Sequence, residues 1–210
     1  MSRLARTERA ALCDTALQVG PDRPTLCEGW TVKDLVVHLL VREGSPAAVG
    51  IAVAPLAWLT AAESRRVGRR EFAELVEKLR NGPPRLSPYA VPRVDELANG
   101  LEFFVHHEDI RRAQPVWAPR TLGDDVEKTL WAMVRRFGKR LVRTSPVGVT
   151  ITDSVTGSTA VLRGGVPSVT VRGLPSEVTL YVFGRRDQAR VELLGNDEAV
   201  ARLKATALGA

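Results

Sequence analysis

The sequence contains too few cysteines for a disulfide framework, because Cys13 and Cys27 are its only two. Few thiols and no framework of bridges are typical of proteins from reducing compartments. The first nine residues, Met1 to Arg9, also lack the apolar core of a secretory signal. Both absences predict a cytoplasmic protein whose thiols stay reduced.

Long hydrophobic runs are scarce as well. The most apolar segment, residues 47–62, is shorter than the ~20 residues that a bilayer-crossing helix needs, and Pro55 interrupts it. It predicts a buried or kinked helix, with a dimer interface or a surface contact with a membrane as the alternatives. We therefore expect no membrane span or membrane partner, and a monomer or homodimer. The sequence also lacks internal repeats and low-complexity tracts.

Positive charge is in excess, with 30 lysines and arginines against 24 aspartates and glutamates and a formal net charge of +6. A basic chain can bind nucleic acids or other anions. Here, however, the basic residues form short pairs that are dispersed along the chain and lack interleaved aromatic side chains. We predict solvated faces and no nucleic-acid partner. The pairs are Arg65-Arg66, Arg69-Arg70, Arg111-Arg112, Arg135-Arg136 and Arg185-Arg186.

Apolar residues at helical spacing dominate the first two thirds of the chain, whose 210 residues are long enough for one large domain or two small ones. Thr31 and Asp34 form the pattern of a capping box before a helix that contains His38. The other predicted helices cover 3–19, 70–80, from Asp95 to before Pro115, and from Asp124 to about 141.

From Ser145 onward the apolar residues alternate, which is typical of strands. The predicted strands lie at 147–151, 160–162, 168–171, 178–183 and 190–194, and a short helix starts near Asp197. The sequence therefore predicts an α+β protein. It consists of a helix bundle over 1–144 followed by a small antiparallel α+β domain over 145–210.

Histidine is rare, with His38, His106 and His107 as the whole set. Glu102 and His106 are four residues apart on a predicted helix, which places them on the same face. Two histidines and one glutamate are a known ligand set for catalytic zinc, with the fourth position left to water or substrate. We hypothesise that His38, Glu102 and His106 bind a divalent metal, with zinc as the expected ion.

Ordinary roles for the same residues stay open. A glutamate and a histidine at this spacing often form a solvated pair, and histidines can be satisfied core residues. The apolar residues at positions 103–105 argue against a plain solvated face. Glu108 and Asp109 follow His106 directly and could orient a ligating imidazole from its outer side.

Two residues near His38 have alternative readings. Asp34 lies four positions before His38 and could orient its imidazole, but the capping role is favoured. Cys27 lies a few residues before the same helix. It could be a catalytic or ligating thiol, although a small buried residue is favoured.

Several segments resemble a known family. Cys27 to Leu39 resembles the GWTVxDLxxHL segment of the mycothiol-dependent maleylpyruvate isomerase N-terminal domain, a DinB/YfiT-like four-helix bundle. Glu102 to His106 resembles the second metal segment of that family. Tyr181 to Arg186 and Val191 to Asp197 resemble its C-terminal domain, which is related to sterol carrier folds. The run His106 to Arg112 resembles an actinobacterial subgroup of unassigned metal-binding members, so the resemblance covers nearly the whole chain in order.

The resemblance implies a DinB-like metal-binding bundle followed by a sterol-carrier-like domain. It implies that a metal on His38, Glu102 and His106 receives the sulfur of a low-molecular-weight thiol such as mycothiol. The thiolate would then attack a small electrophilic substrate, giving isomerisation, conjugation or group transfer. A non-catalytic metal-binding regulatory or interaction protein is the alternative, because one fold serves several functions.

Three arginines are nearest in sequence to these ligands and could hold carboxylates of the thiol or substrate: Arg42, Arg111 and Arg112. A structural role at helix ends is the alternative for each of them. His107 departs from the family pattern and could compete with His106 for the metal.

Overall fold

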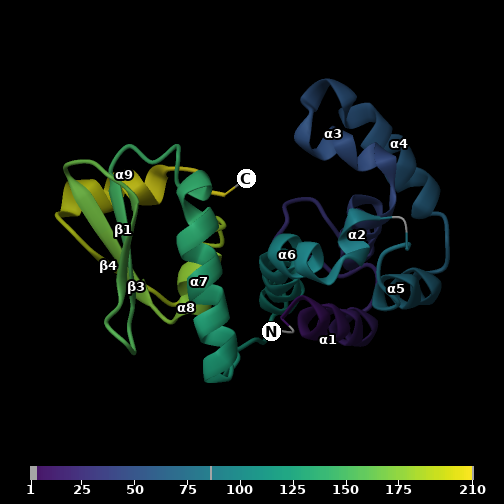
Figure 1. Cartoon of the computed structure of the whole chain (residues 1–210), viewed down its shortest axis with the longest axis horizontal. Coiled ribbons are helices and arrows are strands. Elements are labelled where there is room, and N and C mark those ends of the chain that lie inside the picture. The colour runs from purple at the N-terminus through teal and green to yellow at the C-terminus, as the bar shows by residue number, and fades with distance from the viewer. Residues whose placement is uncertain (1–3, 86, 210) are drawn as a thin grey trace. The chain divides into compact units, whose positions relative to one another are not determined.

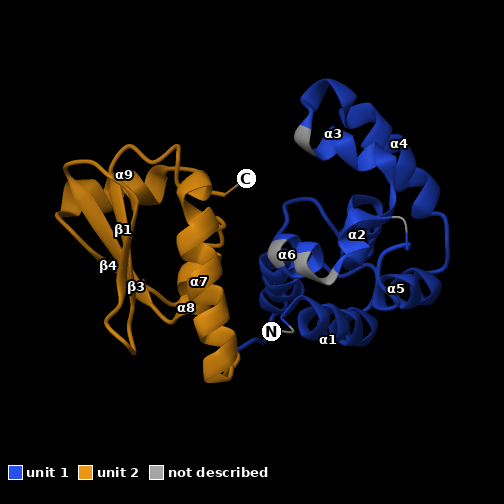
Figure 2. Ribbon diagram, viewed as in Figure 1, with its two compact units in different colours: residues 1, 3–119 blue, residues 2, 120–210 orange. Residues whose placement is uncertain are grey.

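The computed structural model describes residues 4–85 and 87–209 and divides the chain into two compact units (Figure 1 and Figure 2). The first unit ends at Pro119 and the second begins at Arg120. The sequence instead placed the boundary after residue 144. The difference is helix α7 (Asp124–Leu141), whose Leu130 and Val134 are buried, Val134 in the core of the second unit.

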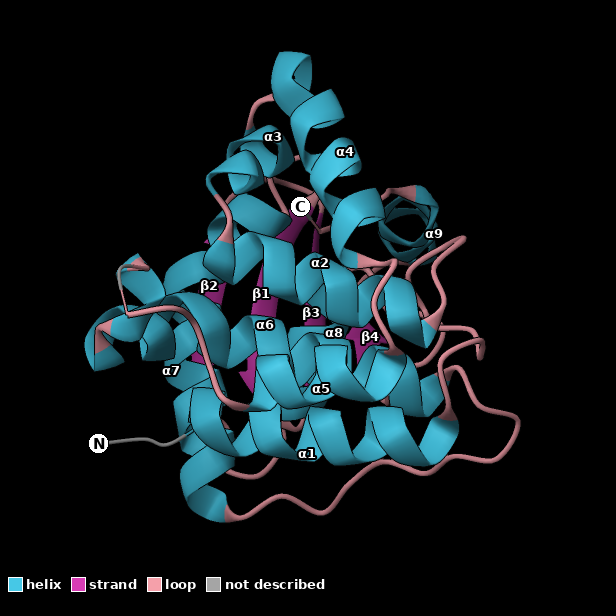
Figure 3. Ribbon diagram, turned by 90° about the vertical axis from the view of Figure 1, so that its right-hand side faces the viewer, coloured by secondary structure: helices cyan, strands magenta, loops and turns pink. Residues whose placement is uncertain are grey.

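The first unit is built from helices, and the predicted ones are confirmed. Figure 3 shows α1, α5 and α2 side by side, with α3 and α4 beyond α2. The main helices are α1 (Leu4–Val19), α2 (Val32–Gly44), α4 (Ala57–Val67), α5 (Phe72–Arg80) and α6 (Pro92–Arg112). Short helical turns connect them: η1 (Pro46–Ala48), α3 (Val49–Ala52), η2 (Ala54–Leu56) and η3 (Pro88–Ala90).

One apolar core joins α1, α2, α5 and α6 and fixes their relative positions. Each helix contributes at least one fully buried side chain, such as Leu12, Leu35, Leu75 and Phe103. The capping box predicted at the start of α2 is present, because Thr31 accepts a hydrogen bond from the backbone of Asp34 and the Asp34 carboxylate accepts one from the backbone of Thr31. This core and cap hold the two helices that carry the candidate ligands.

The apolar segment 47–62 is kinked, as predicted, but it is not buried. An extended residue at Val53 separates α3 from the turn that leads into α4. Ile51 and Trp58 have exposed fractions of 46% and 65%. The segment is not buried because it is broken into short pieces that present no continuous apolar stripe to the core. Among the described helices, none combines the length and apolarity that a bilayer crossing requires.

The second unit is a four-stranded sheet with three helices. Its elements after α7 are β1 (Gly148–Asp153), β2 (Thr159–Arg163), β3 (Ser168–Gly173), α8 (Pro175–Val182), β4 (Glu192–Leu194) and α9 (Asp197–Ala205). The strand order is β2-β1-β3-β4. The outer pairs are antiparallel, but β1 and β3 are parallel, so the predicted all-antiparallel sheet is wrong at its centre. Alternation predicts strands and their faces, but it carries no information on strand direction.

One face of the sheet is packed and the other is not. Val149, Ile151, Val169 and Val171 are fully buried and share a core with residues of α7, α8 and α9. On the other face, Thr150 and Thr170 are only partly buried and Arg172 is exposed. The strict period of two in β1 and β3 explains why these strands were predicted correctly.

The predicted strand at 178–183 is wrong, because most of it belongs to helix α8. Pro175 is at the first helical position, where its missing N–H is tolerated. From α7, Glu127 accepts hydrogen bonds of 2.8 Å from the backbone N–H and from the hydroxyl of Ser176. Every residue of α8 is buried, so packing on all sides overrides the strand preference of its β-branched and aromatic residues.

Glu127 provides a test of this packing through pH. Burial raises the pKa of Glu127 above its usual value, even though its hydrogen bonds to Ser176 oppose the shift. The folded protein therefore binds this proton more tightly than the unfolded chain, and stability from this group falls as pH rises through the raised pKa. In Glu127→Gln the amide oxygen can still accept from the backbone N–H of Ser176 and the amide NH₂ can donate to its hydroxyl, while the titration is abolished. Urea unfolding from pH 4 to pH 7 should show the variant gaining stability relative to the wild type as pH rises, whereas the exposed control Glu198→Gln should show no such trend.

Candidate metal centre

Three polar side chains of α2 and α6 meet in the first unit. Nε2 of His38 lies 3.7 Å from Oε1 of Glu102, and Nε2 of His106 lies 3.3 Å from the same oxygen. One ligand atom from each of the three residues lies within 4.8 Å of the others. The structure thus brings together the three residues that the sequence nominated as ligands. Both histidines present Nε2 to the same carboxylate oxygen, an arrangement that suits a divalent cation.

The electrostatics of this cluster favour a charged carboxylate. Burial disfavours ionisation of Glu102, but the nearby imidazoles of His106 and His38 and the charge of Arg42 outweigh it and hold the pKa of Glu102 well below its usual range. Burial likewise disfavours protonated His106, but Asp109, Cys27 and Glu102 outweigh it and raise its pKa well above the usual value. A cation that binds here must therefore displace a proton from the imidazole.

Asp109 orients the imidazole of His106. Its carboxylate is fully buried and accepts a hydrogen bond of 2.9 Å from Nδ1 of His106, which leaves Nε2 toward Glu102. A carboxylate on the outer nitrogen is typical of metal-ligating histidines. Glu108, the other nominated acid, binds arginines instead. The carboxylate of Asp34 caps α2, because it accepts hydrogen bonds from the backbone and the hydroxyl of Thr31.

His107 faces away from this cluster and has partners of its own. Its Nδ1 lies 2.8 Å from Oε2 of Glu8, and its Nε2 lies 2.9 Å from the hydroxyl of Thr15. These contacts join α6 to α1, and the side chain is buried. One position along a helix turns a side chain by about 100°, so His107 cannot share the face of His106. It is a satisfied core histidine.

The three nominated arginines separate into two groups. Nε of Arg42 lies 3.3 Å from Oε1 of Glu102, and its guanidinium also binds Asn99. Arg111 and Arg112 both bind Glu108. Arg112 is buried, and its guanidinium lies over the ring of Trp117. Arg42 therefore lies at the candidate centre, while the other two contact Glu108 near the end of α6.

A cavity of about 870 Å³ opens beside His38, which is within the range of small-molecule sites. The ring of Trp30 contacts the His38 ring at a centroid distance of 4.9 Å on the cavity wall. Three basic residues also line this cavity: Lys33, Arg65 and Arg69. These residues were not predicted, because the dispersed arginine pairs indicated solvated faces. The available indication was the small residues near Arg65: Ala57, Ala61 and Ser64 in α4, and Gly68 directly after it.

Comparison of this chain with protein-family models finds no match, and comparison with curated proteins finds none either. Two solved structures match. One is a crystal structure of the mycothiol-dependent maleylpyruvate isomerase, with a TM-score of 0.58, 16% identity and 90% of both chains covered. The other is a variant of that enzyme with one histidine replaced by alanine, with a TM-score of 0.60, 15% identity and the same coverage. At this identity the likeness establishes the fold, which the resemblance in the sequence had suggested.

Proposed function

We propose that this protein is a metal-dependent enzyme that uses a low-molecular-weight thiol, such as mycothiol, to modify a small electrophilic substrate by isomerisation or group transfer. The observation that carries the proposal is the His38–Glu102–His106 cluster beside an open cavity, in a chain with the fold of a mycothiol-dependent isomerase. The donor set of two imidazoles and one carboxylate fits zinc and leaves a coordination position for a thiol. When bound, zinc would stabilise a thiol as thiolate at neutral pH.

The residues around the ligands have separate tasks in this proposal. Asp109 holds the proton on Nδ1 of His106, so the lone pair of Nε2 is available toward Glu102. Arg42 holds the carboxylate of Glu102 in place and balances its charge. Arg111 and Arg112 are not part of the proposed site, because their side chains bind Glu108.

The cavity supplies the environment for the thiol and its partner. Lys33, Arg65 and Arg69 outweigh the carboxylate of Asp34 on the same wall, and this net positive charge attracts anionic groups on a thiol or an electrophile. Trp30 offers an apolar ring next to His38. The cavity therefore suits a small polar or acidic molecule with an electrophilic carbon.

Thiol binding should release about one proton per chain near neutral pH, because a free thiol is mostly protonated there and a metal-bound thiol is not. Calorimetric titration of the zinc-loaded protein with mycothiol, in buffers of different ionisation enthalpy, measures this release. Metal-free protein and a zinc-treated His38→Ala variant are the controls and should give neither binding heat nor proton. If the zinc-loaded protein also gives no heat and no thermal stabilisation, the thiol mechanism fails and a non-catalytic metal-binding role takes its place.

A further inference from the structure

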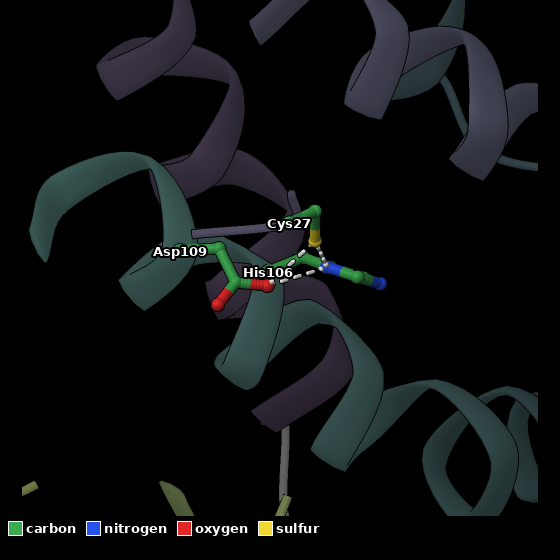
Figure 4. A group of neighbouring side chains, drawn as sticks. All are labelled: Cys27, His106 and Asp109. Carbon is green, nitrogen blue, oxygen red and sulfur yellow. Dashed lines mark hydrogen bonds and ion pairs between the residues drawn. The ribbon is translucent and has the colours of Figure 1, made fainter. Parts of the chain in front are cut away.

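Cys27 lies against the outer side of the same imidazole, outside the centre described above. Figure 4 shows the sulfur of Cys27, a ring nitrogen of His106 and a carboxylate oxygen of Asp109 directed toward one another, with the other ring nitrogen directed away. Sγ lies 3.8 Å from Nδ1 of His106 and 3.3 Å from Oδ2 of Asp109. Nδ1 and Oδ2 are 2.9 Å apart.

These three separations are close to those of a tetrahedral metal site. Bond lengths of about 2.3 Å to sulfur and about 2.0–2.2 Å to nitrogen or oxygen place neighbouring ligand atoms roughly 3.3–3.6 Å apart. The three atoms need to move by only a few tenths of an ångström to reach these values. Sulfur, imidazole and carboxylate are all established ligands of zinc-like cations.

The loop that carries Cys27 is held in place before any ion binds. The backbone N–H of Cys27 donates to the hydroxyl of Thr25, and its carbonyl accepts from the N–H of Trp30. The N–H of Leu26 donates to the backbone carbonyl of Asp109, which fastens the loop to α6 beside the carboxylate. Cys27 is half-buried, while Asp109 is fully buried.

We propose that Cys27, His106 and Asp109 form a second metal site, selective for thiophilic cations such as Cd²⁺, that competes with His38 and Glu102 for His106. The sulfur gives this site a soft ligand that the first centre lacks, which favours thiophilic ions over Mg²⁺ or Ca²⁺. Binding forms a metal–sulfur bond, and the protons of Sγ and Nδ1 leave to solvent. A neutral imidazole has a single ring nitrogen with a lone pair for a metal. His106 can therefore bind the first centre through Nε2 or the second through Nδ1, but not both at once.

Cadmium titration tests this site without measuring activity. Metal-free protein should develop the ultraviolet charge-transfer absorption of a cadmium–thiolate bond, saturating at about one ion per chain. Cys27→Ser should abolish the absorption. His38→Ala should retain it, because His38 is not a ligand of this site, and Cys13→Ser should retain it, because Cys13 is buried and burial raises the pKa of its thiol to about 11. Absorption that persists in Cys27→Ser, or that never appears in the wild type, overturns the proposal.

The competition is tested separately and rests on the proposed function. Zinc-loaded protein should release about one zinc for each cadmium that binds, measured with a chromogenic zinc chelator, and Cys27→Ser should release none at the same cadmium concentration. Full development of the cadmium–thiolate absorption with zinc retained would overturn the competition. If the first centre does not bind zinc at all, the charge-transfer titration of wild type and His38→Ala still decides whether the second site exists.

Discussion

In a Cys27→Ser background, which removes the proposed second site, replacing His38 by alanine should remove nearly all bound metal from a protein that otherwise carries about one divalent ion per chain. The variant leaves Glu102 and His106, and two ligands do not hold zinc against water at useful affinity. The loss should exceed the 10–100-fold that removal of an outer hydrogen-bond partner costs. Metal analysis of purified protein, followed by competition with a zinc chelator, measures it, and His106→Ala should behave in the same way.

His107→Ala is the matched control, because it removes an adjacent histidine from the same helix. It deletes the hydrogen bonds to Glu8 and Thr15 in the core between α1 and α6. It should therefore lower the free energy of unfolding by about 1–3 kcal/mol while keeping the metal. His38 is partly exposed at the cavity, so His38→Ala should lose the metal while its free energy of unfolding changes little. Undiminished metal content in both His38→Ala and His106→Ala would falsify the ligand assignment.

The ligand cluster was predictable because its evidence is local. Glu102 and His106 share a helix face by spacing alone, and the capping box at Thr31 fixes where the helix of His38 begins. The contact of Asp109 with His106 was predictable in the same way, because the two residues are three positions apart and one turn of helix brings them together. The contact between Cys27 and His106 spans 79 positions, and nothing in the spacing of these residues specifies it.

The errors concern features that depend on long-range packing. The direction of β3 relative to β1 and the helical state of 178–182 are decided by how the second unit closes its core. The amphipathic stripe of α7 correctly indicated a buried face, but it could not indicate which core would cover that face. The contacts of Arg112 with Glu108 and Trp117 are likewise tertiary, and its position in the sequence did not indicate them.

Replacing Arg9 by methionine should cause a large loss of stability although Arg9 is not part of the metal centre. Its guanidinium makes hydrogen bonds to both carboxylate oxygens of Glu43 and to Asp95, with side-chain exposed fractions of 5% for Arg9 and 3% for Glu43. It also lies 4.3 Å from the ring centroid of Phe103. Removing one partner of such a buried pair costs about 3–5 kcal/mol, because the remaining charge has lost its compensation in a place that water does not reach. Urea unfolding at neutral pH measures this loss.

The pH dependence and a surface control separate this mechanism from a general packing defect. Burial already raises the pKa of Glu43, and Arg9 opposes that shift. Without Arg9 the pKa should rise further, so the folded variant holds the proton more tightly and its stability should fall more steeply than that of the wild type as pH increases. Arg80→Met removes a partly exposed arginine that pairs with Asp14 and Glu77, and it should cost no more than about 1 kcal/mol. Equal losses in the two variants, or a loss in Arg9→Met that does not change with pH, would show that the ion pair with Glu43 is not what stabilises the contact between α1 and α2.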